Sequence, residues 1–197
     1  LPLFQGRQRR PGRLEGVTGP THRNRTAEVV DSVKGGLSLS GMRNAELEAI
    51  RALKYRYLRT LDLKLWDEFG DTLCEDVTAA YGSPSGEMPA EFKGREQIVE
   101  YMRGALGGNI ITVHVVHHPE ITVDGESATG SWCLEDTVIF PEHSSIIRGA
   151  AYYNDTYRCE DGVWRIERTS YERIYESTMS TDGLPGYALT ANRWAPA

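Results

Sequence analysis

Residues 111–132 read ITVHVVHHPEITVDGESATGSW, and this stretch decides most of the fold prediction. β-Branched residues alternate with other side chains over 110–118, which is typical of a strand. Asp124-Gly125 favours a tight hairpin turn into a second strand over 128–140. Two further strands, over 149–159 and from 163 to about 171, are separated by another Asp-Gly pair. The sequence therefore predicts an antiparallel meander in its second half.

Three helices are predicted before the meander. Apolar residues recur at steps of three and four between Glu46 and Leu61, as on one face of a helix. A second helix is predicted over 63–73 with Asp62 as its N-cap, and a third over 95–106. A short strand (77–81) and a Gly/Pro/Ser-rich loop separate these two helices. The predicted fold class is α+β, with helices packed on one face of a curved antiparallel sheet that can leave a pocket between the layers.

The composition is that of a globular protein of one main domain. The chain has 197 residues, 40% of them hydrophobic, and a formal net charge of −6. The acidic balance argues against a nucleic-acid partner, and no apolar run approaches the ~20 residues of a membrane-spanning helix. Cys74, Cys133 and Cys159 form no CxxC pair. We therefore expect free, mostly buried thiols and a cytoplasmic location.

Charge and composition change near residue 42. Residues 1–41 carry a net charge of +4, are rich in Gly and Pro, and lack helical or strand periodicity. We expect a flexible basic extension there, with an anchor on an anionic surface as the alternative. The main domain is predicted over 42–177, and 178–197 form a C-terminal tail that could cover a subunit interface or the mouth of a cavity.

One face of the strand over 128–140 carries a single charge, that of Asp136. The other residues of this face are Ala128, Gly130, Trp132, Leu134, Val138 and Phe140. Arg168 shares a face with Trp164 and Ile166 in the same way. Because a buried unpaired charge is costly, Asp136 and Arg168 either pair with each other or belong to a polar cluster in an apolar pocket.

The strand over 110–118 carries three histidines. His117 lies on its more apolar face and is expected to pack in the core, whereas His114, on the mixed face, is the candidate pocket residue. A metal site formed by His114, His117 and His118 is disfavoured because the first two lie on opposite faces.

Tyr57 and Asp62 are the candidate pocket residues of the helical part. Five residues apart, they diverge by about 140° on a continuous helix, so both face one pocket only if the chain breaks near 60–62. Alternatively, Tyr57 belongs to the core and Asp62 caps the second helix.

Four stretches resemble the SnoaL-like branch of the nuclear transport factor 2-like superfamily. They read RALKYRYLRTLDLKLWDEFGDTLCEDV (51–77), GREQIVEYM (94–102), the opening stretch at 111–132, and YYNDTYRCEDGVWRIER (152–168). The resemblance extends over 44–176 and implies a cone-shaped α+β barrel with a deep apolar cavity, in a homodimer or homotrimer. Its members include polyketide cyclases, ketosteroid isomerases and dehydratases, so the fold by itself does not decide the reaction.

The residue pattern is most similar to that of the bile-acid 7α-dehydratases. This resemblance implies that His114, polarised by Asp62, acts as a base or proton shuttle and that Tyr57 stabilises an enolate. It also implies that Asp136 protonates the leaving hydroxyl group. The side chains expected to bind a polycyclic or aromatic hydroxy-ketone are Trp66, Trp132, Phe140, Trp164 and Arg168.

We therefore expect a dehydratase that uses no metal or cofactor. Its expected partners are a small hydrophobic substrate and further copies of the chain, with neither nucleic acid nor a membrane. Two alternatives stay open. One is a ketosteroid isomerase-like or polyketide cyclase-like enzyme, and the other is a non-catalytic binding protein or oxygenase β subunit.

Overall fold

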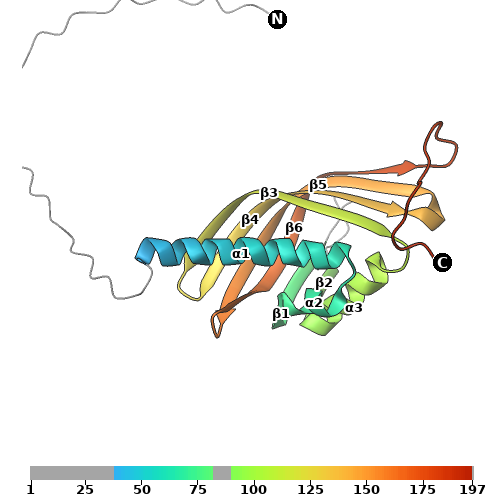
Figure 1. The fold of residues 1–197 in the computed structure, drawn as a ribbon. Coiled ribbons are helices and arrows are strands. Elements are labelled where there is room, and N and C mark those ends of the chain that lie inside the picture. Colours follow the sequence, from blue (N-terminus) through green and yellow to red (C-terminus); the bar gives the residue numbers. More distant parts are fainter. Residues whose placement is uncertain (1–37, 82–89, 197) are drawn as a thin grey trace, which may run out of the picture. The chain divides into compact units, whose positions relative to one another are not determined.

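The computed structural model describes residues 38–81 and 90–196 (Figure 1). Residues 1–37 of the predicted extension, and most of the predicted Gly/Pro/Ser loop, therefore lie outside the described residues. The first helix, α1 (Leu39–Asp62), begins before the predicted boundary at residue 42. Ser38 caps it, because its hydroxyl accepts a hydrogen bond from the Gly41 backbone N–H at 3.2 Å.

The helices follow the predicted pattern, with corrections at the end of α1 and in the length of α2. The apolar stripe of α1 is buried, and α3 (Arg95–Leu106) has the predicted bounds. The second helix, α2 (Trp66–Asp71), is shorter than predicted. Lys64 has a φ of 57°, which a helix does not accommodate, and Leu65 is the N-cap of α2. Asp62 is thus the last residue of α1 and does not cap α2.

The strands are longer than predicted, and one was not predicted. They are β1 (Leu73–Tyr81), β2 (Ala90–Lys93), β3 (Ile111–Asp124), β4 (Ser127–Phe140), β5 (Ser145–Glu160) and β6 (Val163–Ser180). The short strand β2 has too few residues to show an alternation. Strand β6 extends to Ser180, past the predicted start of the tail at residue 178.

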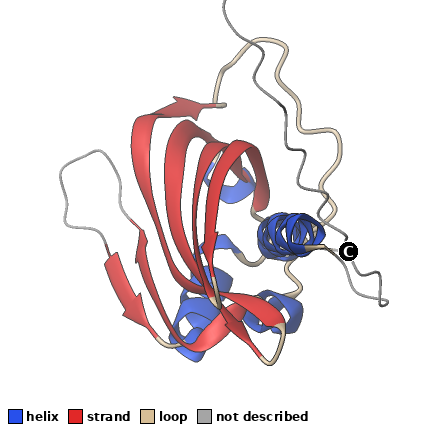
Figure 2. Ribbon diagram, turned by 90° about the vertical axis from the view of Figure 1, so that its left-hand side faces the viewer, coloured by secondary structure: helices blue, strands red, loops and turns tan. Residues whose placement is uncertain are grey.

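The described strands form a mixed sheet in the order β2-β1-β6-β5-β4-β3. The meander from β3 to β6 is antiparallel, as predicted. However, β1 pairs in parallel with β6, so the expectation of a purely antiparallel sheet is wrong. Alternation along a strand defines its two faces but not its neighbour or the direction of pairing. Figure 2 shows the curved sheet with the helices on its concave side.

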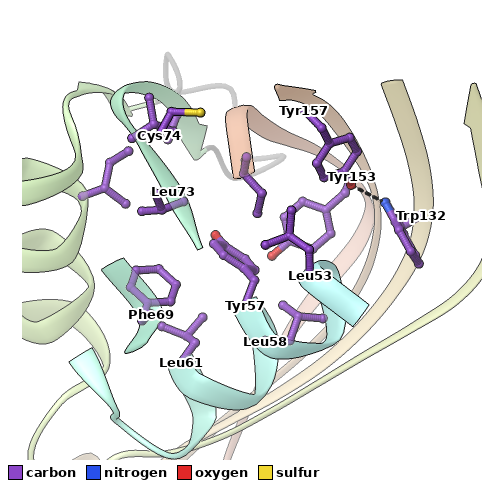
Figure 3. Packing of buried hydrophobic residues seen from close by; sticks show 14 of the residues in the cluster. Leu53, Tyr57, Leu58, Leu61, Phe69, Leu73, Cys74, Trp132, Tyr153 and Tyr157 are labelled. Carbon is purple, nitrogen blue, oxygen red and sulfur yellow. Dashed lines mark hydrogen bonds between the residues drawn. The ribbon is translucent and has the colours of Figure 1, made fainter. Parts of the chain in front are cut away.

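The core lies between α1 and the inner face of the sheet. Tyr57 points into it from α1, and Trp132 donates a hydrogen bond from Nε1 to the Tyr157 hydroxyl at 2.8 Å (Figure 3). The three cysteines are free: Cys74 is buried, and Cys133 and Cys159 are half-buried. Within the described ranges, no helix is long and apolar enough to cross a membrane.

The described part of the tail runs past the ends of α1 and α3. Asn192 Nδ2 donates a hydrogen bond to the Asn109 carbonyl at 2.9 Å, and the Trp194 ring lies 5.1 Å from Lys64 Nζ. Lys64 in turn donates to the Leu106 carbonyl at 2.6 Å. The tail is therefore tied to the junction between the two helices.

Candidate active site

An aspartate and a histidine meet where α1 ends against the edge strand β3. Asp62 Oδ1 lies 2.7 Å from His114 Nδ1. Asp62 also accepts hydrogen bonds from the His114 backbone N–H at 2.9 Å and from the Thr112 hydroxyl at 2.8 Å. When a neutral imidazole donates from Nδ1 to a carboxylate, its Nε2 is left as a proton acceptor. The pair therefore has the arrangement of an oriented general base.

The inward face of β3 is the polar one, contrary to the expectation for His117. His117 is exposed and shares the outer face with Val113 and Val115, whereas Thr112 is buried and the His114 side chain is 8% exposed. The reason is that Asp62 supplies hydrogen-bond acceptors to Thr112 and His114, which makes burying this polar face possible.

A cavity of about 130 Å³ lies against His114, between the helices and the sheet. Its aromatic walls are Tyr81, Tyr101, Tyr153 and Tyr171. Its aliphatic walls include Leu61, Met102, Leu106, Leu134 and Val138. The charged or titratable groups other than tyrosine that line it are His114, Asp136 and Arg173. This is an apolar pocket with a few polar groups that converge on it, as in many small-molecule sites.

Tyr57 lies behind the cavity wall and not on it. Its side chain is fully buried, and its hydroxyl lies 3.1 Å from that of Tyr81, which lines the cavity. Burial raises the pKa of both hydroxyls above the ordinary value, so both remain protonated near neutral pH. Tyr81, which the sequence analysis missed, is therefore the tyrosine of this pair that can donate a hydrogen bond into the cavity.

Asp136 faces the cavity, but its partner is not the predicted one. Arg173 Nη1 and Nη2 donate to Asp136 Oδ1 and Oδ2, both at 2.7 Å. The two side chains are 8% and 5% exposed, respectively. Both carboxylate oxygens are thus occupied by the Arg173 guanidinium, which opposes a role in contacting the leaving group.

Arg168 is exposed, so the expectation that it faces the pocket is wrong. The register between β5 and β6 shifts there: Tyr157 pairs with Ile166 and Thr156 pairs with Arg168. The extra residue, Glu167, forms a bulge that reverses the alternation. Beyond it, Thr169, Tyr171 and Arg173 take the inward positions, and this bulge is what brings Arg173 to Asp136.

The four predicted aromatic substrate contacts do not line the cavity. Trp132 and Trp164 are buried in the core, and Trp66 packs edge-on against Phe69. Phe140 borders a separate surface depression near His143. Tyrosines provide the aromatic wall instead. Alternation along β5 could have identified Tyr153, and alternation along β6 could have identified Tyr171 if the bulge had been known.

A buried ion pair beneath the tyrosines was also missed. Lys54 Nζ lies 2.7 Å from Asp155 Oδ2, and both side chains are 0% exposed. The ammonium lies 3.4 Å from the centroid of the Tyr153 ring, and Tyr157 donates a hydrogen bond to Asp155. Burial lowers the pKa of Lys54, and Asp155 opposes this effect. The signal in the sequence was the position of Lys54 on the apolar stripe, four residues after Ile50.

The three histidines of β3 do not converge. His114 contacts Asp62, whereas His117 and His118 stack on each other with ring centroids 5.6 Å apart. Among the residues that the structure describes, no group of three His, Cys, Asp or Glu side chains could hold a metal ion.

Solved structures share this fold. A scytalone dehydratase-like protein from Novosphingobium aromaticivorans has a TM-score of 0.63 at 18% identity, over 71% of this chain and 91% of that chain. The hexachlorocyclohexane dehydrochlorinase LinA-type3 from Novosphingobium barchaimii has a TM-score of 0.61 at 19% identity, over 70% and 92%. A nuclear transport factor 2-like protein of unknown function from Pseudomonas putida has a TM-score of 0.53 at 16% identity, over 66% and 87%.

These similarities show that the chain has the fold of these solved structures, which confirms the α+β fold class inferred from the sequence. The narrower assignment comes from the sequence of the domain. The family model for the SnoaL-like domain matches residues 43–170, and the chain therefore belongs to the SnoaL-like family.

Proposed function

We propose that the chain is an acid–base enzyme that needs no cofactor and eliminates water from a hydrophobic cyclic hydroxy-ketone. The observation that carries this proposal is the 2.7 Å contact between Asp62 and His114 at the wall of the tyrosine-lined cavity. Proteins described as a scytalone dehydratase-like protein and as a dehydrochlorinase share the fold, which agrees with an elimination.

The reaction begins with proton removal. His114 Nε2 takes the acidic proton on the carbon next to the substrate carbonyl, and Asp62 stabilises the imidazolium that forms. The Tyr81 hydroxyl, backed by Tyr57, donates a hydrogen bond to the developing enolate oxygen. This step converts the ketone to an enolate without any group beyond those of the chain.

The second step expels the hydroxyl group from the neighbouring carbon. As the enolate re-forms the carbonyl, a carbon–carbon double bond forms and the C–O bond breaks, and the departing oxygen takes the proton held by His114 Nε2. The product is an unsaturated ketone and water, and His114 is neutral again. His114 thus serves as base and acid in turn, which replaces the role implied for Asp136, whose oxygens are occupied by Arg173.

Turnover of a panel of hydroxylated cyclic ketones, followed by mass spectrometry, tests this proposal. We expect a product that has lost one water, and we expect His114→Gln and Asp62→Asn each to lower turnover about 10²-fold or more. His117→Gln is the matched control, because His117 is exposed on the outer face of the same strand. We call Asp62 and His114 the dyad, and wild-type turnover in both dyad variants would contradict the proposal.

The mass of the product separates the alternatives. A product of unchanged mass indicates an isomerase or cyclase, which uses the same base without a leaving group. If the protein binds one of these ketones tightly but converts none of them, the result favours the non-catalytic alternative.

A further inference from the structure

One arginine, Arg173, lines the cavity within the described part of the chain, and it is already paired with carboxylates. Both Arg173 terminal nitrogens donate to Asp136, and Arg173 Nε lies 3.3 Å from Glu176 Oε2. The planar guanidinium is the group best suited to a substrate carboxylate, because it offers two parallel donors. Here Asp136 takes the place that such a carboxylate would occupy.

The surrounding charges also oppose an anion. Among the described residues, the carboxylates of Asp62, Asp136 and Glu176 lie at or next to the cavity wall, and Arg173 is the permanently charged cation that lines it. An anionic ligand would have to shed its hydration and lie near these carboxylates, and the described lining residues offer it no unpaired Lys or Arg, so this desolvation is costly.

The size of the cavity limits the ligand further. Its volume of about 130 Å³ is close to that of protein cavities of ~150 Å³ that take benzene. Rings of Tyr81, Tyr101, Tyr153 and Tyr171 form flat walls around this volume. A single ring fills such a space, whereas a fused polycyclic frame exceeds it and would project through the open side of the cavity.

We infer that the cavity selects a single uncharged ring, and that Asp136 is the specificity-determining residue that excludes anionic rings by occupying Arg173. The inference rests on the proposed function only in taking this cavity as the substrate site. It narrows the expected polycyclic or aromatic substrates to monocyclic ones.

Equilibrium binding of three probes by calorimetry tests the inference without turnover. The probes are acetophenone (one neutral ring), benzoate (one anionic ring) and 1-tetralone (two fused rings). We expect wild-type protein to bind acetophenone at least about 10-fold more tightly than either other probe. Asp136→Asn removes the charge paired with the two terminal nitrogens of Arg173, so the affinity of this variant for benzoate should rise about 10-fold or more while its affinity for acetophenone changes little.

Two further variants keep the test decisive. Glu135→Gln, on the exposed face of the same strand, should alter binding of none of the probes. The double variant Asp136→Leu/Arg173→Met removes both charges, so it should bind acetophenone and show no increase in affinity for benzoate. This variant keeps the test open if Asp136→Asn fails to fold. The inference is overturned if the wild type binds benzoate or 1-tetralone as tightly as acetophenone. It is also overturned if the affinity for benzoate rises in the double variant.

The outcomes also separate this inference from the proposed function. If the dyad variants keep wild-type turnover while the probe preference holds, the mechanism fails and the selectivity stands. If the dyad variants lose turnover but benzoate binds the wild type well, only the selectivity fails.

Discussion

The neighbours of Asp62 determine which of two roles its side chain has. The sequence allowed two roles, a helix cap or a partner of a strand histidine. In the structure its carboxylate accepts from His114 Nδ1, the His114 backbone N–H and the Thr112 hydroxyl, at 2.7–2.9 Å. The helix break at Lys64 separates Asp62 from α2, so no cap contact competes for these oxygens.

The buried pair of Lys54 and Asp155 leads to a stability prediction at the same scale. Asp155→Asn leaves the Lys54 ammonium without a compensating charge, so the free energy of unfolding should fall by about 3–5 kcal/mol. The double variant Lys54→Met/Asp155→Asn should recover most of this loss, because it removes both charges and retains an acceptor for Tyr157. Urea unfolding measures both.

Asp76→Asn provides the control for this prediction. Asp76 pairs with Arg158 at an exposed position, and because solvent screens such a pair, its removal should lower the free energy of unfolding far less than Asp155→Asn does. If Asp76→Asn and Asp155→Asn lower the free energy of unfolding equally, the prediction for the buried pair is wrong.

At the scale of the element, the bulge in β6 determines which cation reaches the cavity. A strict alternation from Trp164 predicts Arg168 on the inner face, and this prediction is wrong. Glu167 is an extra residue without a pairing partner in β5. The side chains that point inward beyond it are those of Thr169, Tyr171 and Arg173. A bulge depends on how the paired strand and the layers pack, which single-strand periodicity does not contain.

Strand β5 accommodates the ion pair through a glycine. A Cβ at Gly149 would lie 2.6 Å from Arg173 Nη1, 2.9 Å from Asp136 Oδ1 and 3.0 Å from the Tyr175 carbonyl oxygen. Gly149→Ala must therefore displace the ion pair or the backbone, and we expect it to destabilise the protein by about 1–3 kcal/mol. Urea denaturation measures the change.

Gly104→Ala on α3 is the matched comparison. Its Cβ would meet no atom within 4 Å, and alanine favours a helix over glycine by about 0.5–1 kcal/mol. This variant should gain stability while Gly149→Ala loses it, and the opposite order would refute the packing argument.

For the whole molecule, the cluster of buried tyrosines predicts alkaline unfolding. Burial raises the pKa of Tyr57, Tyr81, Tyr153 and Tyr157 above the ordinary value of 10.0. The folded state therefore holds protons that the unfolded state releases above pH ~10, at up to about 1.4 kcal/mol per pH unit for each tyrosine. Their contribution is complete below pH ~10 and is lost as the pH rises further.

Lys54 acts in the opposite direction, because its lowered pKa makes stability rise with pH up to its ordinary value of 10.5. Four tyrosines outweigh this single group above that pH. Urea midpoints across the alkaline range, with tyrosinate absorbance in parallel, measure the net effect. Tyr153→Phe should reduce the slope of the free energy of unfolding against pH by the equivalent of one proton. If all tyrosines of the folded protein ionise near pH ~10, the prediction is wrong.

The sequence by itself determined the type of most elements and the faces of several. Periods of two and of three to four residues follow from backbone geometry, so they identified the α+β class, the stripe of α1 and the inward position of Asp136. The same patterns, together with the family resemblance, selected Asp62 and His114, whose catalytic role stays a prediction.

Tertiary structure alone decided the parallel pairing of β1 with β6, the bulge that brings Arg173 to Asp136, and the placement of Tyr81 on the cavity wall. It also joined Lys54 to Asp155, which are distant in the sequence. These features arise when buried polar groups must find partners across the whole core, and no local pattern specifies which partner is nearest.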